Sequence, residues 1–145
     1  MSAWTPLGPH RYRIEGDVFF WCPGGEVTPE HATSVCQIFD LMQTQHGYIL
    51  WLIDATLSIP LPPDSRRIYA QWMSSSNCRL SVNVFQTSVA ARTMADLVIR
   101  GVRLRAGVEV TSHVYTSELE ARAGLVGERA RFLAATSLLT DSISA

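Results

Sequence analysis

The sequence predicts an α/β fold: a single, mostly parallel five-stranded sheet with one edge hairpin and four helices, in the order β-β-α-β-α-β-α-β-α. Two observations lead to this prediction. Residues 48–53 form an uncharged run that ends at Asp54, as expected of a central parallel strand covered by helices on both faces. Segments with helical and strand periodicity then alternate along the chain, which predicts strand–helix units joined by right-handed crossovers.

The edge hairpin is predicted near the N-terminus. Residues 10–15 and 18–23 are β-rich and flank Gly16-Asp17, a two-residue turn typical of a tight hairpin. The second of these strands is apolar over Val18–Cys22, so we place it inside the sheet and residues 10–15 at its edge.

Caps and apolar periodicity predict the four helices. Thr28 precedes Pro29 as an N-cap, and Gly47 ends this first helix. The second helix follows a proline-rich loop, the third begins at Ser88, and a capping-box pattern opens the last at Ser117. The last helix carries an apolar stripe of Leu119, Ala123, Val126, Ala130 and Leu133.

Two further strands complete the predicted sheet. Residues 80–85 alternate between apolar and polar side chains up to Val84, and residues 108–115 are rich in β-branched residues. We therefore expect a folded domain over residues 10–135, a flexible arm over residues 1–9 and a frayed tail over residues 136–145.

Composition excludes several classes of function. The 145 residues carry a net charge of −1, which gives no bulk attraction to nucleic acid or to an anionic membrane. All twelve basic residues are arginine, so mechanisms that need a lysine are excluded. The three cysteines and four histidines lack metal-ligand spacing, so we expect no cofactor and no metal. No signal-peptide layout or long apolar run is present, from which we expect a cytoplasmic protein without membrane insertion.

The most informative functional position is the end of the strand at Asp54. In open parallel sheets, functional groups gather beyond the carboxyl ends of the strands. Asp64 and Ser65 lie ten and eleven residues further on, at the start of the second helix, where backbone N–H groups favour added negative charge. Ser65 is a candidate phospho-acceptor, and Arg66 and Arg67 are candidates for binding an anionic group. The alternative is that these residues only cap the helix and end the strand.

A second basic run surrounds the predicted third helix. Arg92 is a candidate for contact with an anion or a partner, and three more arginines follow it at positions 100, 103 and 105. Aromatic residues are not interleaved with these arginines, so the run does not predict a nucleic-acid site.

The element order, the strand ending at Asp54 and the Asp64-Ser65 pair that opens the next helix together resemble the STAS fold. This family includes anti-sigma-factor antagonists, cytoplasmic domains of sulfate transporters and a looser STAS-like group related to CRAL-TRIO lipid-binding domains. In the antagonists the loop reads Asp-Ser-Ser-Gly and its first serine is phosphorylated, whereas Arg66-Arg67 replaces Ser-Gly here. The resemblance implies a non-enzymatic regulatory module that binds a protein partner, switched by phosphate on Ser65.

Two other functions remain open. By analogy with CRAL-TRIO domains the chain could carry a small apolar ligand, and the spacing of the same side chains also fits ordinary core packing. An enzyme would require an acid, a base and a nucleophile that converge in one cleft, and no complete catalytic motif is present. A homo-oligomer is compatible with each reading. The residues expected to line an apolar pocket are Trp51, Tyr69, Trp72, Met73 and Phe85.

Overall fold

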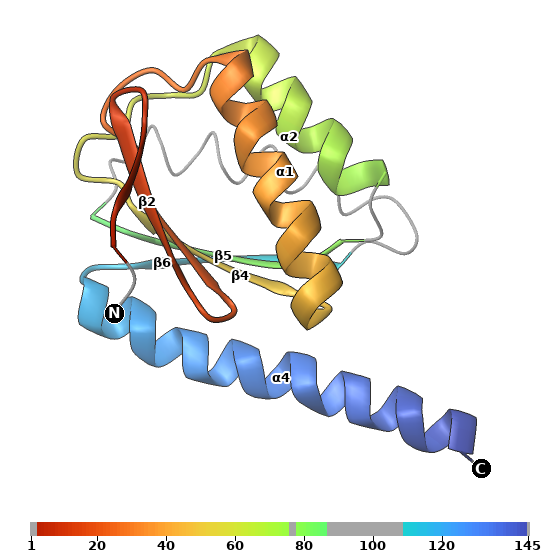
Figure 1. Cartoon of the computed structure of the whole chain (residues 1–145). Coiled ribbons are helices and arrows are strands. Elements are labelled where there is room, and N and C mark those ends of the chain that lie inside the picture. Colours follow the sequence, from red (N-terminus) through yellow and green to blue (C-terminus); the bar gives the residue numbers. More distant parts are fainter. Residues whose placement is uncertain (1–2, 76–77, 87–108, 145) are drawn as a thin grey trace.

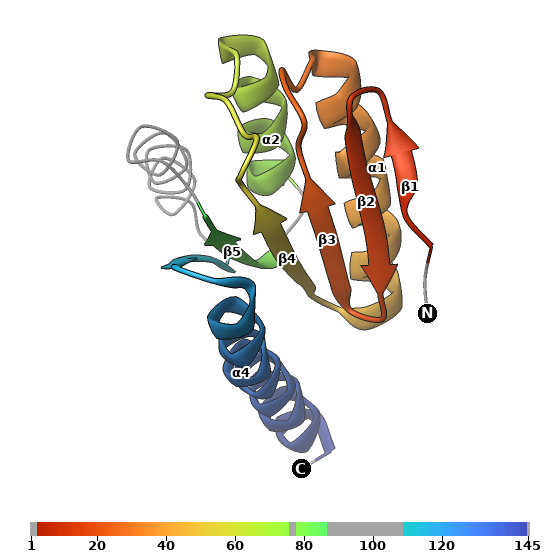
Figure 2. The same cartoon turned by 90° about the vertical axis from the view of Figure 1, so that its left-hand side faces the viewer.

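A computed structural model of the chain describes residues 3–75, 78–86 and 109–144. They form one six-stranded sheet, in which the strands lie side by side in the order of the sequence (Figures 1 and 2). The strands are β1 (Thr5–Leu7), β2 (His10–Glu15), β3 (Val18–Cys22), β4 (Ile49–Asp54), β5 (Arg79–Phe85) and β6 (Glu109–Tyr115). The described helices are α1 (Pro29–His46), α2 (Pro63–Ser75) and α4 (Glu118–Ser144).

The sheet is mixed, and this corrects the predicted five-stranded, mostly parallel sheet. β1, β2 and β3 pair antiparallel, and β3 to β6 pair parallel. The additional strand is β1, which lies inside the predicted flexible arm. Pro6 has no backbone N–H, so the segment gives little strand signal in the sequence. An edge strand tolerates a proline, because one of its sides needs no partner.

Other boundaries also differ from the predictions. Helix α4 continues to Ser144, through the residues expected to fray. The structure describes three helices, and the helix predicted from Ser88 lies outside the described residues, as does Arg92.

The predicted local signals for α1 are confirmed. Thr28 Oγ1 accepts a hydrogen bond from the His31 backbone N–H (3.2 Å), and His31 Nδ1 accepts one from the Thr28 N–H (3.2 Å). The helix ends at Gly47, whose φ of 81° is left-handed and favours glycine. The hairpin turn is also confirmed, with Gly16 at φ 63°.

Helices cover both faces of the sheet (Figure 1). α1 and α2 lie on one face, where Phe39 of α1 packs edge-on against Trp51 of β4, with ring centroids 4.9 Å apart. α4 crosses the other face, where Phe132 stacks on Tyr48 at 5.0 Å. β4 is therefore buried on both sides, as its uncharged sequence predicts.

Helix α4 turns one side to the sheet and leaves its apolar stripe exposed. Ala121, Leu125 and Phe132 are buried against the strands. The exposed fractions of Leu119, Val126 and Leu133 are 81%, 63% and 52%. The most regular apolar pattern of this helix is therefore not part of the core.

Two arginines hold α4 against the hairpin. Arg122 Nη1 lies 2.8 Å from a carboxylate oxygen of Glu15, and Arg129 makes two hydrogen bonds to Asp17, of 2.7 and 2.8 Å. The Tyr48 hydroxyl also donates to Asp17 (2.6 Å). Burial opposes ionisation of Asp17, but the bonds from Arg129 and Tyr48 outweigh it and lower the pKa of Asp17. These contacts tie the C-terminal helix to the N-terminal hairpin.

The orientation of α4 is testable by truncating one side chain on each of its sides. We expect Phe132→Ala to lower the free energy of unfolding by about 3–5 kcal/mol, because it leaves a cavity in the core. Leu119→Ala on the exposed side should change it by no more than about 0.5 kcal/mol. Urea denaturation measures both. Similar losses for the two variants would contradict the observed orientation.

Candidate functional site

The carboxyl ends of the parallel strands β3, β4 and β5 meet at one edge of the sheet (Figure 1). The connections that follow β3 and β4 lead there into the N-termini of α1 and α2. Residues 55–67, the loop after β4 and the start of α2, contain the predicted switch residue Ser65 and the candidate binding residues Asp64, Arg66 and Arg67. We call this segment the loop face.

Asp54 anchors the beginning of the loop face. Its Oδ1 accepts hydrogen bonds from the Thr56 backbone N–H (3.0 Å) and the Thr56 hydroxyl (2.6 Å). The same hydroxyl lies 2.6 Å from Oε1 of Gln86, the residue after β5, and the Ala55 N–H donates to the Phe85 carbonyl (3.0 Å). Asp54 therefore fixes the path of the loop, and its carboxylate is engaged within the chain.

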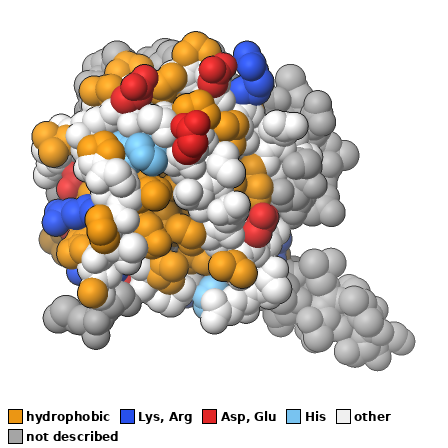
Figure 3. All heavy atoms as spheres, turned by 45° about the horizontal axis from the view of Figure 1, so that its top comes forward, with side chains coloured by type: hydrophobic (Ala, Val, Ile, Leu, Met, Phe, Trp, Pro, Cys, Tyr) orange, Lys and Arg blue, Asp and Glu red, His pale blue; other side chains and the backbone are white. Residues whose placement is uncertain are grey.

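Apolar side chains protrude from this anchored loop. Leu57 and Ile59 are 68% and 47% exposed. Asp64 and Arg67 follow at the start of α2, in an ion pair of 3.5 Å whose side chains are both more than 70% exposed. Apolar and acidic side chains intermingle on the side of the molecule that carries α1, α2 and their preceding loops (Figure 3).

Ser65 does not lie on this surface. Its residue has no exposed area, and its hydroxyl donates to the Val27 carbonyl at 2.6 Å. This bond joins the start of α2 to the loop that precedes α1. In this conformation the oxygen is out of reach of a kinase, and a phosphate would displace the bond.

The arginine pair divides between two environments. Arg67 is exposed beside Asp64, whereas Arg66 is half-buried. Arg66 Nε is shielded from solvent and has no hydrogen-bond partner among the described residues. Of the two, Arg67 is the more exposed, and it already lies beside an acidic side chain.

The residues expected to line one apolar pocket lie on opposite faces of the sheet. Trp51, Tyr69, Trp72 and Met73 belong to the core under α1 and α2, whereas Phe85 belongs to the core under α4. The first four are each at most 9% exposed. The five side chains therefore do not line one cavity, and their contacts are those of core packing.

A histidine pair lies at the same edge, near the start of α1. His10 is 2% exposed, and its Nδ1 accepts a hydrogen bond from the Gly24 N–H (2.9 Å). The ring proton is therefore on Nε2, which lies 3.1 Å from the Glu26 carbonyl and 3.2 Å from His31 Nδ1. Burial and the neighbouring His31 lower the pKa of His10. A neutral His10 thus holds the β3–α1 loop.

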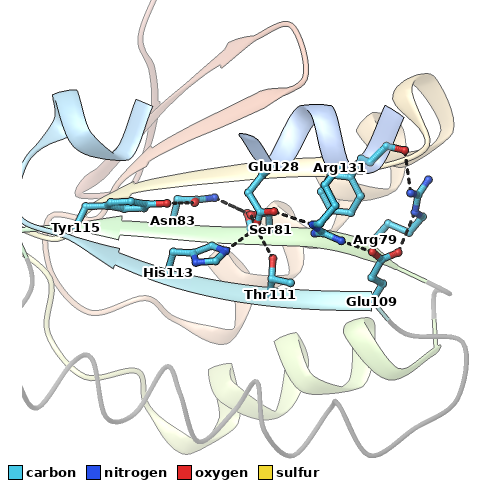
Figure 4. A network of polar contacts seen from close by, with 10 residues as sticks. Arg79, Ser81, Asn83, Glu109, Thr111, His113, Tyr115, Glu128 and Arg131 are labelled. Atoms are coloured by element: carbon cyan, nitrogen blue, oxygen red, sulfur yellow. Dashed lines mark hydrogen bonds and ion pairs between the residues drawn. The ribbon is translucent and has the colours of Figure 1, made fainter. Parts of the chain in front are cut away.

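A second polar cluster lies between the sheet and α4, centred on Glu128 (Figure 4). Oε1 of this buried carboxylate accepts hydrogen bonds from Ser81 of β5 (2.8 Å) and Thr111 of β6 (2.7 Å), and it lies 2.6 Å from His113 Nε2. Arg131 Nε donates to the other oxygen at 2.8 Å. Burial opposes the charge, but these four hydrogen bonds outweigh it and lower the pKa of Glu128 to about 2.

The cluster brings an acid, an imidazole and hydroxyls together without forming a catalytic set. Ser81 is fully buried, and its hydroxyl donates to the carboxylate rather than to the imidazole. A serine nucleophile would instead need a base that accepts its proton. His113 is paired with Glu128 from the exposed side of the cluster. The arrangement pairs the buried carboxylate with the hydroxyls of the strands and fixes α4 on the sheet, although Arg131 Nη2 has no hydrogen-bond partner among the described residues.

Ion pairs extend the cluster toward the start of β5. Arg131 also pairs with Glu109, and Glu109 lies 3.3 Å from Arg79 Nε. Arg79 Nη2 donates to the Phe132 carbonyl at 3.1 Å, within the body of α4 (Figure 4). Arg79, like Ser81 and Thr111, thus connects a strand to α4.

Sequence reasoning did not predict this cluster. A signal was present, because Ser81 and Asn83 alternate with apolar residues in β5, and Thr111 and His113, two residues apart, lie on one face of β6. When helices cover both faces, such polar residues are buried and need partners. Glu128 supplies one from α4, but periodicity alone does not show which helix faces them.

Comparison with known proteins adds no family: no family model matches the chain, and no curated protein matches it. Among the described residues, no group of three histidine, cysteine or acidic side chains could hold a metal ion. None of the helices in the described ranges combines the length and apolar character needed to cross a membrane.

Removal of the central carboxylate tests its structural role. We expect Glu128→Ala to lower the free energy of unfolding by about 3–5 kcal/mol, because it leaves Arg131 and the buried hydroxyls without their acceptor. Glu118→Ala, which removes a more exposed partner of Arg122, should cost less than about 1 kcal/mol. Chemical denaturation measures both, and a loss below 1 kcal/mol for Glu128→Ala would contradict this role.

The neutral His10 predicts a pH dependence of stability. Its pKa in the folded state is below the ordinary value of 6.5, so below pH 6.5 the unfolded chain takes up a proton that the folded chain does not. We therefore expect the free energy of unfolding to fall as the pH drops below 6.5. His10→Gln and His10→Asn should both flatten this slope, as measured by denaturation between pH 7.5 and about 5. An unchanged slope in both variants would contradict the prediction.

Proposed function

We propose that the chain is a non-enzymatic protein-interaction module that binds its partner through the loop face. The observation that carries this proposal is the exposure of Leu57 and Ile59 on a loop that the protein holds in place. Exposed apolar side chains on an anchored loop favour binding, because their burial is favourable and little ordering is left for association.

The loop is restrained at both ends and along its length. The contact of Asp54 with Thr56 fixes its start, and the bond from Ser65 to Val27 fixes the helix that follows. Three prolines, at positions 60, 62 and 63, restrict the backbone between these points. The apolar side chains are therefore presented in a defined arrangement.

The charges beside the apolar residues can provide specificity. The ion pair of Asp64 and Arg67 is exposed, so it contributes little to folding. Either side chain can exchange its partner for an opposite charge on another protein, which orients the complex. This combination of apolar anchors and a charged rim is typical of a protein-binding surface.

The proposal follows the resemblance to STAS domains in two respects only. It keeps the non-enzymatic, partner-binding role and the location at the carboxyl end of the strand that ends at Asp54. It does not include a phosphate switch at Ser65, because that hydroxyl is buried and bonded to the Val27 carbonyl. The packing of Trp51 and Phe85 on opposite faces likewise gives no support to a ligand carrier.

The loop face is tested by making its apolar residues acidic. Proteins captured from the native cell lysate by the wild-type chain should be lost with Leu57→Asp/Ile59→Asp. Once a captured partner is purified, the double variant should weaken its binding by at least about 2 kcal/mol, the loss typical of buried anchors. Isothermal titration calorimetry measures this loss.

The matched control is Leu41→Asp on α1, because Leu41 is 72% exposed but lies far from the loop in the sequence. This variant should bind as the wild type does. Equal binding by the loop variant and the control, with both folded by circular dichroism, would refute the proposal.

A further inference from the structure

The exposed side of α4 carries an apolar stripe that the loop face does not use. Its members are Leu119, Ala123, Val126, Ala130 and Leu133, which we call the α4 stripe. All five are exposed, and the three large ones are among the seven large apolar side chains exposed in the described residues. Residues on a helix advance by about 100° each, so the stripe points away from the side formed by Ala121, Leu125 and Phe132.

The spacing of the stripe fits a helix as its partner. Successive members are four, three, four and three residues apart, which gives a mean period of 3.5 residues. That period is the one by which a helix keeps an apolar seam facing a second helix.

The alternation of side-chain size identifies the orientation. Leu119, Val126 and Leu133 occupy one position of the repeat, and Ala123 and Ala130 occupy the other. In a parallel pair each position meets its own counterpart, so alanine layers would be underfilled. In an antiparallel pair the two positions meet each other, and every layer combines a large with a small side chain. The stripe is thus complementary in side-chain size to the same stripe of a second, antiparallel copy.

The arginines next to the stripe are already paired with carboxylates within the chain. Arg122 and Arg129 are bonded to Glu15 and Asp17 of the hairpin. Glu120 accepts hydrogen bonds from Thr116, of 2.7 Å from its hydroxyl and 3.2 Å from its backbone N–H. A second chain can therefore approach the stripe without leaving these two arginines as unpaired buried charges.

We propose that the α4 stripe is a self-association surface, on which α4 of a second copy packs antiparallel. The stripe spans about 21 Å of helix, which is a short seam. The helix is already ordered on the sheet, so association has little folding cost. We therefore expect a reversible dimer whose population depends on protein concentration.

Sedimentation velocity of the full chain over a wide concentration range tests the dimer. We expect Val126→Glu to raise the dimer dissociation constant at least about tenfold, because it buries an unpaired carboxylate in the seam. The control Leu41→Glu, an exposed leucine of α1, should leave that constant unchanged. A wild-type chain that stays monomeric over the whole concentration range would overturn the proposal. This outcome would leave the proposed binding of a partner by the loop face untouched.

A second variant tests the orientation while keeping the surface apolar. Ala123→Leu/Ala130→Leu places large side chains opposite large ones in an antiparallel seam, so we expect weaker association. A parallel seam or a non-specific apolar contact would instead be strengthened by the added apolar surface, and that result would overturn the antiparallel arrangement. Both positions are exposed in the monomer, and circular dichroism confirms folding. Neither variant touches the loop face, so this test is independent of the proposed partner.

Discussion

The buried carboxylate of Glu128 determines how α4 is arranged on β5 and β6. The α4 face of β5 and β6 carries the hydroxyls of Ser81 and Thr111, and a covered hydroxyl needs a hydrogen-bond partner. Glu128 satisfies both, together with His113 and Arg131. Turning this carboxylate inward fixes which side of α4 faces the sheet. Leu125 and Phe132 then enter the core, and the more regular apolar stripe faces outward.

The sequence predicts well those features that depend on neighbouring residues alone. The hairpin at Gly16, the cap at Thr28 and the stop at Gly47 depend on the residues themselves and their immediate neighbours. The run before Asp54 likewise reports its own burial on two faces. The rotation of α4 depends instead on a match between a helix and two strands distant in sequence. Apolar periodicity alone would turn the stripe inward, because it carries no information about the polar partners on the sheet.

At the carboxyl edge of the sheet, the sequence predicts where the distinctive residues lie but not what each of them contacts. The sequence locates the loop after Asp54 correctly as a distinctive place, because strand ends and proline-rich loops are local features. It does not predict that Ser65 turns inward, since that depends on the Val27 carbonyl, 38 residues earlier in the chain. Adjacent residues on a helix point about 100° apart. Ser65 can therefore be fully buried while its neighbour Asp64 is exposed.

The two proposed surfaces have a fixed relation because one rigid sheet separates them. β6 ends at the carboxyl edge, so α4 starts there and runs back across the sheet (Figure 1). In an antiparallel pair of α4 helices, the carboxyl edges of the two copies therefore point in opposite directions. The two loop faces would lie at opposite ends of the dimer, where a single compact partner could not contact both. Such a dimer would gain no avidity for a monomeric partner, but it would connect two partner molecules.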